Sequence, residues 1–98
     1  MDAKTTTNRV RWFRLLADEN RLRIIETLFN GPQNVTALVE KLALEQSLVS
    51  HHLASLRREG LVHPIRKGRS LYYELSESVT FNPVSREIEL SCCRLQLK

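Results

Sequence analysis

The sequence predicts a small, mainly α-helical domain that carries one β-hairpin. Its 98 residues are enough for one hydrophobic core. Apolar residues recur every three or four positions through residues 8–59, which is typical of amphipathic helices. Over residues 61–75 they alternate with polar residues on either side of a glycine, which is typical of a hairpin. We therefore expect a single domain over 1–98, in which helices precede the hairpin and one more helix follows it.

The first half of the chain predicts helices over 8–16, 19–29, 35–42 and 46–59. We expect the polar segment 1–7 in front of them to be disordered. Asp18 is a good N-cap for the second helix, and Asn30-Gly31-Pro32 is a typical stop signal at its end. The last two helices are joined by about three residues and have the size of a helix-turn-helix.

The second half predicts the hairpin and a last helix. Strands are expected over 61–66 and 70–75, and Gly68 between them can adopt the positive φ of a tight turn. The helical spacing then returns, because one stripe of a helix over 84–96 would hold Val84, Ile88, Cys92 and Leu95. Apolar stripes therefore lie at both ends of the chain, in 8–16 and in 84–96.

The composition excludes several classes of protein. Lys and Arg number 15 against 11 Asp and Glu, and this net charge of +4 permits a polyanionic partner. No apolar run approaches the roughly 20 residues of a membrane helix, and the N-terminus lacks the apolar stretch of a secretory signal. Two adjacent cysteines cannot form a disulfide framework. We expect a cytoplasmic protein without a membrane contact, and no constellation of residues indicates an enzyme.

Four separated motifs follow one another along the middle of the chain. Residues 15–25 read LLADENRLRII, and residues 46–53 read QSLVSHHL. Gly60-Leu61-Val62 comes next, and Gly68-Arg69 with Tyr73 lies in the predicted hairpin. Together these motifs resemble the winged helix-turn-helix repressors of the ArsR/SmtB type. The resemblance implies a homodimer, joined through the helices over 8–16 and 84–96. It also implies that this dimer binds a palindromic operator in double-stranded DNA, represses transcription and is released by an inducer.

The helix over 46–59 carries the residue types that read base edges. A recognition helix presents short polar side chains on its N-terminal turns, where its backbone comes closest to the major groove. Amide, hydroxyl and imidazole groups can bond there to adenine or guanine. We therefore expect base contacts from Gln46, Ser47, Ser50 and His51. The alternative interpretation of this pattern is a solvated polar face.

Basic residues extend the expected DNA-binding surface. Arg57 and Arg58 lie late on the same helix, and Arg66, Lys67 and Arg69 surround the tip of the hairpin. Cations on a projecting hairpin can neutralise phosphates or enter a minor groove. The alternative is that these charges only keep an edge strand soluble.

Cys92 and Cys93 are the only thiols, and they are adjacent. Soft ions prefer thiolate ligands, so the pair is a candidate site for an inducer such as As(III), another thiophilic ion or an oxidant. The metal sites that the family carries on its third and last helices have no counterpart, because 35–42 holds no cysteine and no histidine follows His63. The alternative is that both cysteines are small buried hydrophobes, in which case no cofactor is implied.

The sequence is also compatible with two other classes of function. The chain could be a winged-helix module that binds protein, or a thiol-based redox or metal-binding protein. The outward polar row on 46–59 favours DNA over a protein partner. The absence of a C-x-x-C motif disfavours the thiol protein.

Overall fold

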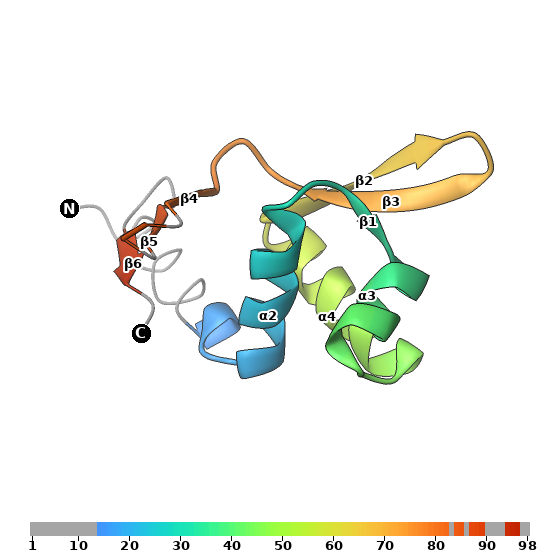
Figure 1. The fold of residues 1–98 in the computed structure, drawn as a ribbon, viewed down its shortest axis with the longest axis horizontal. Helices are drawn as coiled ribbons and strands as arrows, with labels where there is room; N and C mark the ends of the chain where they lie inside the picture. Colours follow the sequence, from blue (N-terminus) through green and yellow to red (C-terminus); the bar gives the residue numbers. More distant parts are fainter. Residues whose placement is uncertain (1–13, 83, 86, 90–93, 97–98) are drawn as a thin grey trace.

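The computed structural model describes residues 14–82, 84–85, 87–89 and 94–96, and for residues 81 and 94–96 only the backbone. Figure 1 shows packed helices, a hairpin that projects from one end and a small second sheet at the other end. In chain order the elements are α2 (Glu19–Leu28), β1 (Gln33–Asn34), α3 (Val35–Leu42), α4 (Gln46–Arg58), β2 (Val62–Lys67), β3 (Ser70–Leu75), β4 (Thr80–Asn82), β5 (Glu87–Glu89) and β6 (Arg94–Gln96). Residues 14–16 are also helical, and the rest of the helix predicted over 8–16 lies outside the described residues. No helix in the described part of the chain is long and apolar enough to cross a membrane.

The helix-turn-helix is formed by α3 and α4, with bounds within one residue of those predicted. The side chain of Asn34 accepts the N–H of Ala37 at 2.7 Å and so caps α3. Ala43 then ends α3 in the left-handed region, with φ of 54°. After two further residues the chain re-enters a helix at Gln46. This short turn makes α4 cross α3 and leaves one side of α4 open.

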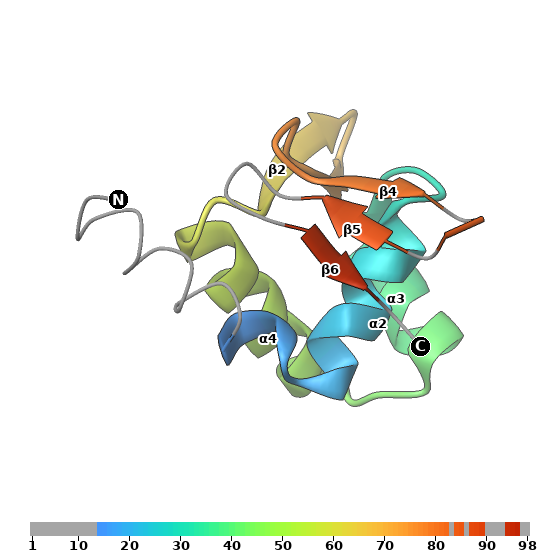
Figure 2. The ribbon, with the colours of Figure 1, turned by 90° about the vertical axis from the view of Figure 1, so that its left-hand side faces the viewer.

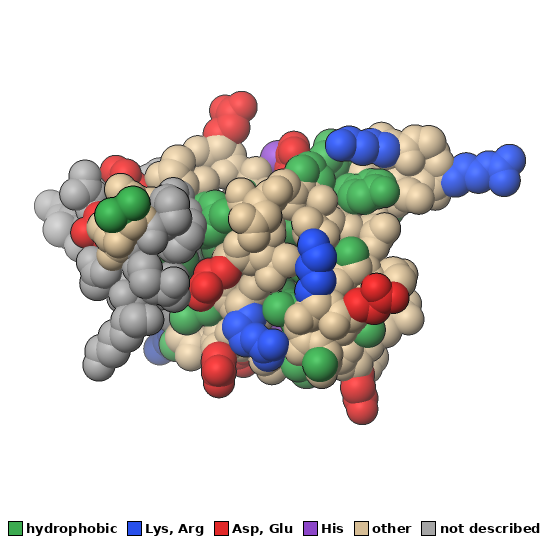
Figure 3. All heavy atoms as spheres, in the orientation of Figure 1, with side chains coloured by type: hydrophobic (Ala, Val, Ile, Leu, Met, Phe, Trp, Pro, Cys, Tyr) green, Lys and Arg blue, Asp and Glu red, His purple; other side chains and the backbone are tan. Residues whose placement is uncertain are grey.

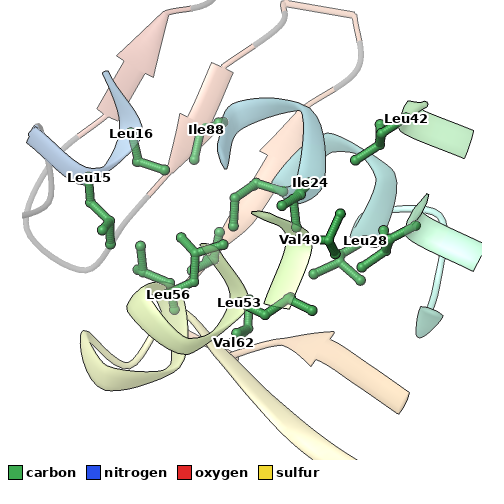
Figure 4. Close-up of a cluster of buried hydrophobic side chains, with 14 residues drawn as sticks. Leu15, Leu16, Ile24, Leu28, Leu42, Val49, Leu53, Leu56, Val62 and Ile88 are labelled. Carbon is green, nitrogen blue, oxygen red and sulfur yellow. The ribbon is translucent and has the colours of Figure 1, made fainter. Parts of the chain in front are cut away.

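A cluster of aliphatic side chains holds the helices together (Figure 4). Its fully buried members come from all three helices and from the chain after them: Ile24, Ile25, Leu38, Val49, Leu53, Leu56, Leu61, Val62 and Ile88. Burying one such side chain is worth about 1.5–3 kcal/mol. Because close-packed cores permit few rearrangements, this cluster fixes the direction of α4 relative to α2 and α3.

The predicted hairpin is the β2–β3 pair, which we call the wing. Its antiparallel register runs from Val62 opposite Leu75 to Lys67 opposite Ser70. Gly68 makes the turn with φ of 62°. The short strand β1 pairs with the other edge of β3, so the sheet has the order β1-β3-β2. The strand β1 was not predicted from the sequence, and it is only two residues long.

The helix predicted over 84–96 is wrong. Thr80–Asn82, Glu87–Glu89 and Arg94–Gln96 form an antiparallel sheet of order β4-β5-β6 beside the helices (Figure 2). Ile88 is fully buried between the half-buried Glu87 and the exposed Glu89, which is the two-residue alternation of a strand. Val84, which the helical stripe would have buried, is 94% exposed.

Two local features accompany the formation of this sheet. Asn82 accepts the N–H groups of Val84 at 2.9 Å and Ser85 at 3.2 Å, and so turns the chain at the end of β4. Ile88 is β-branched and favours strands over helices. The apolar spacing of this segment, and its Glu, Leu, Arg and Gln residues, would also suit a helix, so local propensity does not decide between the two structures.

Candidate nucleic-acid interface

The two faces of α4 differ in burial. Its inner face is mainly apolar, and Val49, Leu53 and Leu56 are at most 1% exposed, although His52 and Ser55 are buried there as well. Its outer face is exposed and consists of Gln46, Ser47, Ser50, His51, Ala54, Arg57 and Arg58. This division follows the helical period of 3.6 residues. The four residues predicted to read bases therefore lie together on the first two turns, and Arg57 lies on the same face further along.

A groove of about 390 Å³ lies between α4 and the wing. Ser50, Ala54, Arg57 and Arg58 line it from α4, and Tyr73 lines it from β3. Two guanidinium groups and two hydroxyl groups around a small alanine give this groove donors and positive charge. Such a combination suits phosphate oxygens, because charge-assisted hydrogen bonds to phosphate are among the strongest in proteins.

The groove brings together basic residues that the sequence had indicated and one aromatic residue that it had not. Arg58 follows Ala54 by four positions, so it reaches the same face of α4, and its Nη2 lies 3.4 Å from the Oγ of Ser55. Tyr73 was part of the family motif but had no role. Its pairing opposite Pro64 in the wing brings it to the groove. Arg58 was expected from its place late on the helix, whereas Tyr73 required the tertiary structure.

The wing tip gathers the other predicted cations. Arg66, Lys67 and Arg69 are all exposed. Figure 3 shows Lys and Arg side chains at the free end of the hairpin. The Nζ of Lys67 lies 5.7 Å from the ring centroid of Tyr72, a cation–π contact that directs the side chain across the strand. The tip therefore presents positive charge to a partner that approaches along the outer face of α4.

His63, for which the sequence offered no partner, pairs with Glu74 across the wing. The two residues are register partners in β2 and β3, and their side chains meet at 2.7 Å between Nε2 and Oε1. Opposite pairs of this kind contribute about 0.2–1 kcal/mol to a sheet. The pair stabilises the base of the wing rather than its tip.

His51 and His52 do not form a metal pair. His51 is exposed on the outer face, whereas His52 is 4% exposed and points toward α2. Their ring centroids are 5.8 Å apart at an interplanar angle of 56°. The Nδ1 of His52 instead accepts a hydrogen bond from the Nε of Arg21 at 3.1 Å.

The surroundings of His52 favour its neutral form. Burial lowers the pKa of His52 below its ordinary value of 6.5; the carboxylate of Asp18 opposes this shift, and the charges of Arg21 and His51 add to it. The net direction is downward.

The described residues hold no group of three or more His, Cys, Asp and Glu side chains that could bind a metal ion. Cys92 and Cys93 lie outside the described residues, so the predicted inducer site stays a prediction. The chain after Glu89 resumes its described course at β6, and the two cysteines fall between these points in the sequence.

Residues 18–63 match the family described as "Bacterial regulatory protein, arsR family". This segment contains α2, the helix-turn-helix and the start of β2. The transcriptional activator HlyU of Vibrio cholerae is 36% identical over 75 residues, which are 76% of this chain and 69% of HlyU. The chain belongs to the arsR family. This confirms the family and the winged helix-turn-helix fold inferred from the sequence motifs, although not the closing helix.

Other members of the arsR family are similar over the same region. The regulator NmtR of Mycobacterium tuberculosis is 41% identical over 78 residues, which are 80% of this chain and 65% of NmtR. The repressor SmtB homolog of Synechocystis is 37% identical over 71 residues, which are 72% of this chain and 54% of that relative. The chain thus spans between about half and two thirds of the length of these two relatives. All three relatives are regulators of transcription, in agreement with the expectation of a non-enzyme.

Solved structures give the same result for the fold. A structure of HlyU from Vibrio cholerae superimposes with a TM-score of 0.72 at 35% sequence identity, covering 79% of this chain and 84% of HlyU. A homodimeric winged helix-turn-helix DNA-binding domain from Mycobacterium bovis superimposes with a TM-score of 0.70 at 28% identity, covering 76% of this chain and 68% of that domain.

Proposed function

We propose that this arsR-family chain is a homodimeric repressor that acts in the cytoplasm, binds a palindromic DNA operator and leaves it when an inducer binds. The observation that carries the proposal is the outer face of α4. Its polar first turns pass into a basic groove, and the groove passes into a basic wing. A module that binds protein would not need two sets of cationic hydrogen-bond donors, one in the groove and one on the wing, next to the polar face of α4.

Each part of this surface has a separate task. Gln46, Ser47, Ser50 and His51 enter the major groove and contact base edges, because their side chains are short and their helix turns are exposed. Arg57 and Arg58 bind the phosphates that border this major groove. Arg66, Lys67 and Arg69 reach the next stretch of backbone or the minor groove beside it.

Dimerisation places two such surfaces on one operator. Two recognition helices about 34 Å apart would meet successive major grooves on one face of B-DNA. The sheet β4-β5-β6 and residues 14–16 lie at the end of the molecule opposite the wing tip (Figure 1). A two-fold axis at that end leaves both wings free. The homodimeric state of the Mycobacterium bovis domain supports this arrangement.

The direction of regulation is proposed from the family resemblance and the site. The relatives include a protein named as an activator, HlyU of Vibrio cholerae, and one named as a repressor, in Synechocystis. A small DNA-binding dimer blocks polymerase by occupying the promoter and requires no further contact to do so. Transcription of the operator-linked gene in a purified system should therefore fall as protein is added.

The inducer is proposed to act at Cys92 and Cys93. Their adjacency and softness suit As(III), another thiophilic ion or an oxidant. Both fall in the sequence between β5 and β6, and Ile88 of β5 is part of the core. A change in this region would therefore act on the same end of the molecule as the proposed dimer contact.

Selection from a pool of random duplexes tests the proposal. The full chain is incubated with the pool at low and moderate salt, and bound DNA is sequenced over several rounds. We expect an enriched inverted repeat, and light scattering should give a dimer both alone and on that DNA. If no sequence is enriched and affinity is the same for every duplex, the chain is not a sequence-specific regulator. Enrichment of a single half-site bound by a monomer would contradict the palindrome and the dimer.

A further inference from the structure

One side chain, Arg21 on α2, ties three parts of the fold together. Its Nη1 donates to the carbonyl oxygen of Leu15 at 3.1 Å, in the helical segment that precedes α2. Its Nε donates to Nδ1 of His52 on α4, also at 3.1 Å. Its backbone N–H is held by the side chain of Asp18 at 3.2 Å. Arg21 therefore links α4 to the start of α2 and to the chain in front of it.

His52 is the residue of α4 to which Arg21 is hydrogen-bonded. Its neighbour His51 and Ser50 before it belong to the exposed face proposed to read bases, whereas the imidazole of His52 is buried on the opposite side. Movement of His52 by a fraction of a turn would rotate both of these side chains. The link therefore controls where the outer face points, beyond what the apolar contacts of Val49 and Leu53 determine.

The hydrogen bond defines the protonation state of His52. Arginine always donates, so Nδ1 must accept, and the single proton of the neutral ring lies on Nε2. Nε2 is buried and has no hydrogen-bond partner among the described residues, and the Oδ1 of Asp18 is 3.9 Å from it. A second proton would have to go on Nδ1, where it would face a guanidinium group and break the bond.

We propose that Arg21 and His52 are positioning residues for DNA recognition, and that protonation of His52 opens their contact and loosens α4 from its DNA-reading orientation. This inference rests on the proposed function, because it assigns a task to a contact behind the same helix. In this proposal neither Arg21 nor His52 contacts DNA directly. The contact works only with a neutral ring, so DNA affinity is coupled to pH.

Three titratable or charged side chains face His52, and they come from α2, its N-cap and α4. Asp18 and Arg21 face it from α2 and its cap, and His51 lies next to it on α4. The elements α3 and β2 also pack against α4, and among the described residues they add no charge that acts on His52. Burial, Arg21 and His51 together outweigh the attraction of Asp18, and the pKa of His52 is lowered from 6.5.

Two isosteric substitutions separate the link from simple burial of a side chain. In His52→Asn the amide oxygen takes the place of Nδ1, so it can accept from Arg21 but cannot be protonated. In His52→Gln the amide lies near the place of Nε2 and is too far along the side chain to accept from Arg21 in the same position. Both variants are neutral and polar, and they differ in where the acceptor lies.

The first measurement is the affinity for a fluorescein-labelled duplex that carries the sequence enriched in the selection. At pH 8 we expect His52→Asn to bind like the wild type, and His52→Gln and Arg21→Ala to bind about tenfold more weakly. Arg23→Ala is the matched control. It removes an arginine from the same helix whose guanidinium donates to the carbonyl of Leu42 on α3 at 3.0 Å and to Asn20 on α2 at 3.5 Å. Thermal melting shows at which temperature each variant is folded.

The second measurement is the ratio of the wild-type dissociation constant to that of His52→Asn between pH 8 and pH 5.5. Both proteins contain His51 and His63, so the ratio cancels the gain in DNA attraction when those histidines become charged. We expect a ratio near one at pH 8 and about threefold weaker wild-type binding at pH 5.5. This comparison uses two folded proteins and stands even if His52→Gln fails to fold.

The third measurement needs no DNA. Long-range ¹H–¹⁵N NMR spectra of the free protein report which ring nitrogen of His52 carries the proton. We expect the Nε2–H form at pH 7.5 and a change in the Arg21 Nε–H signal as His52 is protonated. A ring protonated on Nδ1 at pH 7.5 would overturn the inference, as would a flat ratio across pH or equal affinities of the Asn and Gln variants. Those results leave the proposed function intact, whereas failure to enrich any duplex removes the proposed function and with it the positioning role.

Discussion

Ile88 of β5 is the register partner of Leu95 of β6, and the side chain of Ile88 is fully buried. The same side chain belongs to the cluster formed by α2, α3 and α4. The sheet β4-β5-β6 is therefore attached to the helices through the core of its own chain. This differs from the sequence interpretation, in which Ile88 and Leu95 shared a helical stripe that faced a second copy.

Truncation of Ile88 should destabilise the single chain. We expect Ile88→Ala to lower the free energy of unfolding by about 2–5 kcal/mol, because a buried branched side chain leaves a cavity when it is removed. Urea unfolding followed by circular dichroism measures this. Val84→Ala is the control, since Val84 is 94% exposed and its loss should change the stability by less than about 0.5 kcal/mol. A loss at Val84 that grows with protein concentration would instead place Val84 at the dimer contact.

The sequence predicted the helices and the wing because each of them carries a local signal. Asp18 and Asn34 are capping residues that accept backbone N–H groups as expected of their type, and Gly68 takes the positive φ that the hairpin turn requires. Before Val84, Asn82 accepts the N–H groups of Val84 and Ser85 in the same way, yet β5 follows instead of a helix. An apolar spacing of four fits a helix there, and the competing alternation around Ile88 is only three residues long. Burial against the helices decides between them, and burial is not visible in the sequence.

The candidate site divides in the same way. Its exposed members on α4 follow from the helical period, and all four residues expected to read bases are on the outer face. The groove with Tyr73 required the wing to fold back beside α4. The contact between Arg21 and His52 joins residues 31 positions apart, and no local pattern indicates it.

The cap of α2 gives a prediction about stability and pH. Asp18 accepts the N–H groups of Asn20 at 2.9 Å and Arg21 at 3.2 Å. Asp18→Ala should therefore cost about 1 kcal/mol at pH 7, and Asp18→Asn much less, because asparagine caps as well as aspartate. Burial raises the pKa of Asp18, but these hydrogen bonds and the charges of His52 and Arg21 outweigh it and hold the pKa below 3.8.

The sign of the pH dependence follows from that shift. The charged carboxylate contributes stability that is present above pH 3.8 and is lost as the pH falls through the lower pKa of the folded protein. The difference in stability between the wild type and Asp18→Asn should thus shrink over this range. Urea unfolding at a series of pH values measures it. A difference that stays constant at low pH would show that the charge of Asp18 contributes nothing.

The residues proposed to read bases should affect specific binding only. We expect Ser50→Ala or His51→Ala to weaken binding to the selected duplex by about 1–3 kcal/mol and to reduce the preference at one base pair. Binding to a random duplex should change little, because phosphate contacts dominate it. Ser78→Ala, at an exposed position between β3 and β4, is the matched control. Equal losses on selected and random DNA would show that these side chains contact the backbone instead.

The wing cations should affect all DNA alike. The slope of log affinity against log salt is negative, and its magnitude falls by about 0.9 for each phosphate contact that is removed. Arg66→Ala and Arg69→Ala should therefore each make the slope less steep by roughly that amount. The affinity for selected and random duplexes should fall in parallel. Arg14→Ala is the control. It removes an exposed cation from the segment 14–16, which lies away from the wing (Figure 1), and it should leave the slope unchanged. An unchanged slope in both wing variants would mean that these side chains remain solvated in the complex.

The thiols give the prediction that separates inducer binding from DNA binding. As(III) or a mild oxidant should release the wild-type protein from the selected duplex, and the variant Cys92→Ser with Cys93→Ser should bind the duplex equally well without responding. By linkage, the duplex must weaken binding of As(III) to the wild type by the same factor by which As(III) weakens binding to the duplex. Titration of As(III) with and without DNA measures both factors. Because soft ions require thiolate ligands, a serine variant that still responds would place the inducer site elsewhere in the chain.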